Sequence, residues 1–92
     1  MNHSDQFLQG MGQLISDYAA LAGCTYYEIC QELSISPQTY AGVWKGRVTN
    51  FNYYREIYLY IYDDLRETWQ RERMRDDFMR LFHHSSTKNE SE

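Results

Sequence analysis

Apolar residues recur at steps of three and four along this chain, a spacing that favours helices throughout. In the first segment, Ser4 can cap a helix that runs to about Leu21, and Gly23 is a natural stop. Gly10 and Gly12 weaken its first half, so firm helix is expected from near Gly12. The apolar stripe of this helix contains Phe7, Leu8, Met11, Leu14, Ile15, Tyr18 and Leu21.

Two further helix-start signals follow this segment. Thr25, with Glu28 three residues on, has the form of a capping box, in which two free amide donors of a first helical turn are satisfied together. Ser36 can cap the next helix, and Pro37 fits its first position, where no amide hydrogen is needed. Two short helices with a brief connection form a helix-turn-helix arrangement. They are expected to run to about Leu33 and from Pro37 to about Lys45, with a stop at Gly46.

The segment 53–82 has more than one interpretation. Apolar residues and tyrosines alternate in its first half, as in a strand, but a helical stripe that continues to Trp69 is longer and favours helix. A shorter stripe over 74–82 is offset in phase, so the segment is either one long bent helix or two helices. The sequence therefore predicts an all-α fold of four or five helices in one domain over 1–82, with an extended C-terminal helix. Residues 83–92 have no apolar side chain and are expected to be disordered.

The composition is typical of a folded domain without a catalytic or metal site. A hydrophobic content of 42% with nine tyrosines excludes a disordered chain. Cys24 and Cys30 lack the spacing and number of zinc ligands and are expected to be reduced, buried thiols. His83 and His84 point to different helical faces and have no cysteine or carboxylate cluster beside them. No nucleophile–base pair stands at a motif spacing, so neither an enzyme nor a cofactor is predicted.

A short motif, "LAGC" at 21–24, has the form of a lipoprotein cleavage site. No Lys or Arg precedes Cys24, and polar residues interrupt every apolar run before it, so a signal peptide is not predicted. The longest apolar run, "IYLYIY", is much too short to cross a bilayer. We therefore expect a cytoplasmic protein without a membrane partner.

Charge is distributed unevenly, although the net charge of the chain is −4. The window 34–55 contains no Asp or Glu and carries three positive residues, Lys45, Arg47 and Arg55. The segments on both sides of this window are acidic. Because electrostatic attraction fades over about 8–10 Å in physiological salt, a local basic surface can attract an anionic partner despite the negative total.

The segment from Thr25 to Gly46 resembles the helix-turn-helix of the lambda-repressor-like family, which includes phage Cro and CI repressors and Xre regulators. Ser34 stands where the family usually has glycine, and a positive φ there costs a serine about 1 kcal/mol. Gly42 and Trp44 stand at positions that are often polar in the family. The residues that carry the resemblance are Ile29, Cys30, Leu33, Ile35, Ser36, Thr39, Tyr40, Val43 and Gly46.

This resemblance implies binding of double-stranded DNA, with the helix after Ser36 in the major groove. Gln38 would contact adenine, Ala41 or the Thr39 methyl would contact a thymine methyl, and Gly42 would permit close backbone approach. The three basic residues would contact phosphates. Thr25, Tyr26, Asn50 and Asn52 would donate to phosphate oxygens. The full predicted set is Thr25, Tyr26, Ser36, Gln38, Thr39, Ala41, Gly42, Lys45, Arg47, Asn50, Asn52 and Arg55.

Three basic residues per chain are few for a DNA-binding surface, so we expect a homodimer that binds a two-fold DNA site. The expected function is that of a transcriptional regulator, specifically a repressor. The alternative is a protein-interaction module with the same fold and no DNA contact, such as a phage-encoded inhibitor or an antitoxin-like partner. The acidic total, Gly42 and Trp44 favour this alternative. The predicted dimer interface contains Tyr58, Trp69, Met74, Phe78, Leu81 and Phe82.

Overall fold

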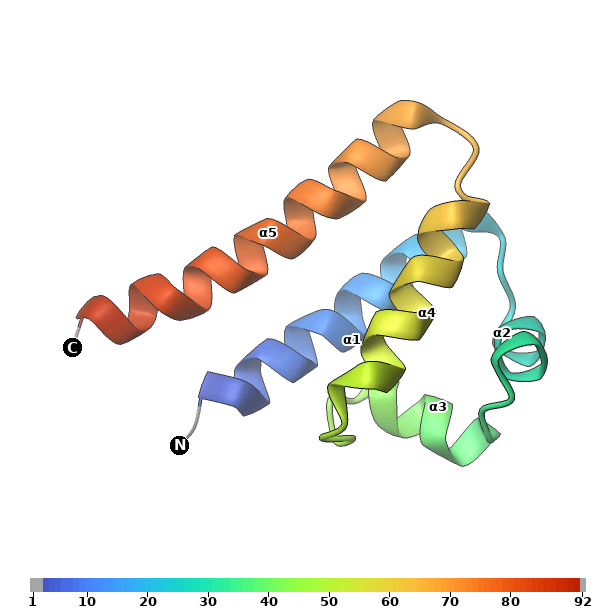
Figure 1. The fold of residues 1–92 in the computed structure, drawn as a ribbon, viewed down its shortest axis with the longest axis horizontal. Coiled ribbons are helices and arrows are strands. Elements are labelled where there is room, and N and C mark those ends of the chain that lie inside the picture. Colours follow the sequence, from blue (N-terminus) through green and yellow to red (C-terminus); the bar gives the residue numbers. More distant parts are fainter. Residues whose placement is uncertain (1–2, 92) are drawn as a thin grey trace.

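The computed structural model describes the backbone of residues 3–91 and the side chains of residues 6–83. These residues form helices and connecting turns without a strand, which confirms the all-α class. No helix among them is long and apolar enough to span a lipid bilayer. The helices are α1 (His3–Ala22), α2 (Tyr26–Leu33), α3 (Pro37–Trp44), α4 (Phe51–Asp64) and α5 (Thr68–Ser91) (Figure 1).

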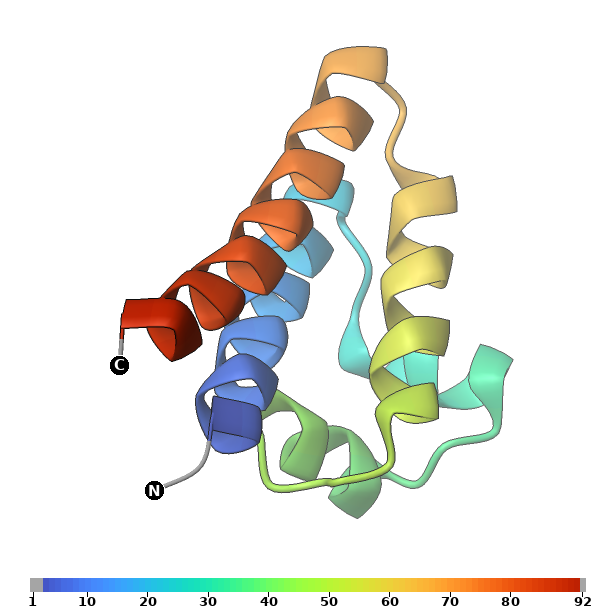
Figure 2. The same cartoon turned by 60° about the vertical axis from the view of Figure 1, so that its left-hand side comes forward.

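The segment 53–82 is divided between two helices, so the interpretation as a strand is wrong. α4 ends before Leu65, whose backbone is extended at φ −69° and ψ 132° and whose side chain is buried. The chain then reverses, and α5 runs antiparallel to α1 and beside it (Figures 1 and 2). α5 continues as helix to Ser91, through most of the segment that was expected to be disordered. No Gly or Pro interrupts it, so its backbone hydrogen bonding has no forced stop.

α1 is the central helix and contacts α3, α4 and α5, whereas α2 packs on α3 and α4. The first half of α1 is helical, contrary to the expectation that firm helix begins near Gly12. Burial explains this, since Leu8 and Met11 both lie in the core. The start at His3 precedes the predicted cap Ser4, whose side chain lies outside the described residues. The buried core contains Leu8, Met11, Leu14, Ile15, Tyr18, Ala19, Cys24, Ile29, Cys30, Ile35, Tyr40, Val43, Tyr54, Ile57, Ile61, Leu65 and Met74.

The connection between α2 and α3 has the predicted local structure. The hydroxyl of Ser36 accepts a hydrogen bond from the Thr39 amide at 3.1 Å, and Pro37 begins the helix. Thr25 likewise accepts from the Glu28 amide at 3.1 Å. Ser34 stands where the lambda-repressor-like family usually has glycine, and it adopts the left-handed conformation expected at that position, with φ 55°. Both short helices therefore begin at a side-chain cap that stands next to them in the sequence.

The second half of the predicted capping box is replaced by a tertiary contact. The carboxylate of Glu28 accepts a hydrogen bond from the Tyr60 hydroxyl at 2.6 Å, across to α4. A phenol that is brought close by the packing of α2 on α4 is a strong donor to a carboxylate. Glu28 therefore connects two helices through its side chain, in addition to its backbone role in the first turn of α2.

Candidate functional site

The predicted DNA-contact residues lie mainly at one end of the molecule. α3, the connection 45–50 and the first turn of α4 all lie at this end (Figures 1 and 2). Tyr26 on α2 lines a hollow of about 180 Å³ together with Ile35 and Pro37, so it lies beside the start of α3. The exposed members of the predicted set are Thr25, Tyr26, Ser36, Gln38, Ala41, Lys45, Arg47, Asn50, Asn52 and Arg55.

The basic residues of this surface are not neutralised within the chain. Among the described side chains, the ion pair that forms joins Arg80 to Asp77 at 3.1 Å, and both residues belong to α5. Lys45, Arg47 and Arg55 form no ion pair with a described carboxylate. Their charges are therefore directed to solvent, as a surface that attracts an anion requires. We call the exposed residues of the window 34–55 the basic face.

Gly42 has a packing role within the chain. The loop after α3 folds back on the helix, and the Arg47 amide donates to the Gly42 carbonyl at 2.8 Å. A Cβ at position 42 would lie 2.9 Å from the Val48 side chain. Val48 therefore packs where a side chain at position 42 would project.

Four other members of the set take part in helix capping: Thr25, Ser36 and Asn50 as caps, and Thr39 through its contact with the cap Ser36. Thr39 is half-buried, and its hydroxyl accepts from the Ser36 hydroxyl at 2.9 Å. Asn50 caps α4, and its side chain accepts from the Asn52 amide at 3.0 Å. Gln38 and Ala41 are exposed on α3 and have no such role in the described contacts. Of the residues predicted to contact bases, these two are therefore the ones that are exposed and take no part in capping.

The residues predicted for a dimer interface separate into three groups. Met74 is fully buried within the chain, so it cannot contribute to a dimer interface. The sequence could not distinguish a contact between subunits from the packing of α5 on the protein's own core. Tyr58 stands against Phe78 with ring centroids 5.4 Å apart, and Leu81 lies over Gly10. Only Trp69 and Phe82, each more than half exposed, present an apolar surface.

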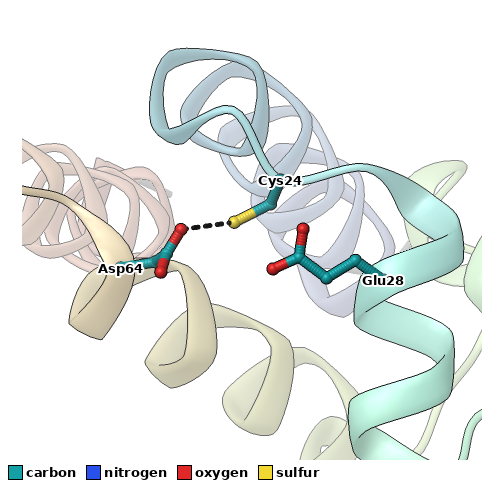
Figure 3. Close-up of side chains that lie close together, drawn as sticks. All are labelled: Cys24, Glu28 and Asp64. Atoms are coloured by element: carbon teal, nitrogen blue, oxygen red, sulfur yellow. Dashed lines mark hydrogen bonds between the residues drawn. The ribbon is translucent and has the colours of Figure 1, made fainter.

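A second group of chemically active side chains lies where the turn before α2 meets the end of α4. The Cys24 thiol donates to Asp64 Oδ2 at 3.2 Å, and the Glu28 carboxylate faces the same sulfur (Figure 3). One ligand atom from each residue lies within 4.8 Å of the other two. We call these three residues the cysteine–carboxylate cluster.

The environment of this cluster favours the neutral thiol. Burial raises the pKa of Cys24 to about 12, and the hydrogen bond to Asp64 and the charge of Glu28 act in the same direction. The sequence indicates none of this, since it predicts Cys24 to be a buried thiol and Glu28 to be part of a capping box. Asp64 follows 40 residues after Cys24, so only the packing of α4 brings it there. The spacing of four between Cys24 and Glu28 was the one available signal.

Comparison with protein-family models, with curated proteins and with solved structures gave no match. The structure supports a small domain of five helices over the described residues. Two features then remain as the basis for a function: the basic face, and the cysteine–carboxylate cluster between the start of α2 and the end of α4.

Proposed function

We propose that this chain is a sequence-specific regulator that binds double-stranded DNA through a helix-turn-helix formed by α2 and α3. The observation that carries the proposal is the basic face, which is exposed, free of acidic residues and without internal ion pairs among the described side chains. A local positive surface of this kind supplies the phosphate attraction on which DNA binding depends. The resemblance of residues 25–46 to the lambda-repressor-like family supports the same function.

Exposed residues of the basic face and of the start of α2 have defined roles in this proposal. Gln38 reads adenine through N6 and N7, and the Ala41 methyl contacts a thymine methyl. Lys45, Arg47 and Arg55 neutralise phosphates. Thr25, Tyr26, Asn50 and Asn52 donate to phosphate oxygens and position α3 in the groove.

The proposed active form is a homodimer that represses by occupying a two-fold operator. Three phosphate-neutralising residues per chain give weak binding, and a second copy doubles the contacts. α5 lies on the opposite side of α1 from α3, so a dimer through α5 leaves both α3 helices accessible (Figure 1).

The test is selection of binding sites from a random duplex pool, followed by mobility shifts across a range of salt concentrations. We expect affinity to fall steeply as salt rises, and Arg47→Ala to weaken all sequences alike and to reduce the salt slope by about 1. Gln38→Ala should relax the preference for one base while leaving the salt slope unchanged. Arg66→Ala is the matched control, since this exposed arginine lies between α4 and α5, outside the basic face and outside the helix proposed to form the dimer.

A protein-interaction module is the second candidate, and exposed aromatic side chains favour it. Tyr26 and Tyr27 on α2 and Trp44 on α3 are each about half exposed or more. Such rings are typical of protein interfaces. If low salt and micromolar protein give no DNA binding, the regulator is excluded and this candidate remains. Trp44→Ala should then weaken capture of a partner protein far more than Arg66→Ala does.

A further inference from the structure

We propose that Cys24, Glu28 and Asp64 form a binding site for one divalent metal ion of the zinc class. The three residues come from different elements: the turn after α1, the first turn of α2 and the last residue of α4. Their donor atoms converge on one point, with every pair within 4.8 Å. This site is independent of the proposed DNA binding, so either can fail without the other.

The donor set selects the ion. One sulfur and two carboxylate oxygens suit Zn²⁺, which accepts sulfur, nitrogen and oxygen ligands, whereas Mg²⁺ and Ca²⁺ prefer oxygen alone. Sγ and Asp64 Oδ2 are 3.2 Å apart, a separation that two ligands of one small ion can adopt with bond lengths of about 2.3 Å and 2.1 Å. Binding replaces the hydrogen bond between them, and the thiol proton leaves to solvent.

The surroundings supply what a metal site needs beyond its ligands. Tyr60 donates to Glu28 Oε2 at 2.6 Å and so orients this carboxylate, as outer partners of metal ligands commonly do. Asp64 is exposed and lines a hollow of about 320 Å³ with Leu21, Ala22 and Gln70, which gives an ion a route from solvent. Water from this side can complete a tetrahedron around three protein ligands.

The charge of the cluster also indicates a cation. Cys24 is only 8% exposed, yet its sulfur lies between two carboxylates and not among apolar side chains alone (Figure 3). Arg66 lines the neighbouring hollow but forms no ion pair with Asp64 among the described side chains. Two carboxylates that face one buried sulfur, without a basic side chain paired to either, produce a negative potential that a divalent ion neutralises.

The test uses Co²⁺ as a spectroscopic replacement for Zn²⁺ on the full chain in reducing buffer. Wild type should bind one Co²⁺ per chain, with a thiolate charge-transfer band in the near ultraviolet that Zn²⁺ abolishes by competition. Cys24→Ser should remove the band, and Asp64→Asn should weaken Co²⁺ binding. Tyr60→Phe should weaken it about 10-fold, the lower end of the effect of outer partners.

Two matched controls separate a site from general thiol or carboxylate binding. Cys30→Ser removes the other buried cysteine, which lies outside the cluster, and should keep the band. Asp63→Asn removes an exposed carboxylate next to Asp64 and should bind Co²⁺ like wild type. Asp63 and Asp64 are both exposed, so neither substitution alters a buried side chain and the two variants can be compared directly. Absence of the band in wild type, its persistence in Cys24→Ser, or equal affinities of the two aspartate variants would overturn the proposal.

Discussion

At the scale of single residues, Ser34 in the turn between α2 and α3 adopts a backbone conformation that is unfavourable in free energy for serine. Its φ is 55°, in the left-handed region. The geometry is set by a hydrogen bond from the Ile35 amide to the Cys30 carbonyl at 2.9 Å, which closes the end of α2. Ile35 is buried, so the turn cannot relax without exposing it.

We therefore expect Ser34→Gly to stabilise the protein by up to about 1 kcal/mol, since glycine adopts positive φ without a steric penalty. Urea unfolding monitored by circular dichroism measures the change. Gly46→Ala is the converse case, because φ there is +71° and a Cβ would lie 2.6 Å from the Gln9 backbone. It should destabilise clearly, and a Ser34→Gly variant less stable than wild type would contradict the interpretation of the turn.

Residues whose partners stand nearby in the sequence were predictable, and those with distant partners were not. The caps by Thr25, Ser36 and Asn50 follow from neighbours within three positions. The contact of Glu28 with Tyr60 spans 32 residues and depends on how α2 packs on α4. The cysteine–carboxylate cluster escaped prediction for the same reason, since helical spacing says nothing about which helix ends meet.

At the scale of elements, the close packing of α1 on α3 depends on Gly12. A Cβ at this position would meet the carbonyl groups of Val43 and Trp44 at the end of α3. These are backbone atoms and cannot turn aside as a side chain can. Gly10, one half-turn earlier, faces the Leu81 side chain, with its Cδ2 2.6 Å from the Cβ position.

The two glycines therefore form a matched pair of tests. Gly12→Ala should destabilise by about 1–3 kcal/mol, because overpacking against backbone exceeds the gain in helix propensity. Gly10→Ala should change stability much less, since Leu81 can rotate and alanine favours the helix by about 1 kcal/mol. Thermal unfolding of both variants gives the comparison. Equal losses at the two positions would show that side-chain and backbone neighbours constrain α1 alike.

The division between α4 and α5 shows what helical periodicity leaves undetermined. The apolar stripes over 54–69 and 74–82 are offset in phase. This offset indicates that the chain changes direction between them, but not whether it bends or reverses. Two residues account for the reversal of the chain between α4 and α5. Leu65 leaves the helix and buries its side chain, and Arg71 donates to the Leu65 carbonyl. Neither contact is visible as a sequence spacing. Met74 then becomes core and not interface, because α5 returns onto α1.

At the scale of the whole molecule, one buried and one half-buried tyrosine join α5 to the other helices. Tyr18 on α1 donates to Asp77 on α5 at 2.6 Å, and Tyr58 on α4 packs on Phe78 of α5. Burial raises the pKa of Tyr18 from 10.0 to about 12, with a further contribution from Asp77. Burial, assisted by Tyr62, likewise raises the pKa of Tyr58 to about 12. Because the pKa of both phenols is higher in the folded chain than in the unfolded chain, their neutral forms stabilise the fold.

This linkage predicts a loss of stability at alkaline pH. A group whose folded pKa is raised stabilises the fold fully below its unfolded pKa of about 10, and this contribution is lost as pH rises through the folded pKa of about 12. We expect the free energy of unfolding to fall between these values, with phenolate absorbance rising at the same time.

Tyr18→Phe tests the share of one contact in this pH dependence. The variant should be less stable than wild type at neutral pH, because it loses the hydrogen bond to Asp77, but should decline less steeply between pH 10 and pH 12. Tyr27→Phe is the control, since this ring is 64% exposed, and its slope should match wild type. A Tyr18→Phe variant that declines as steeply as wild type would mean that the attachment of α5 to α1 does not depend on a neutral phenol, and that the alkaline loss arises at the contacts of α4.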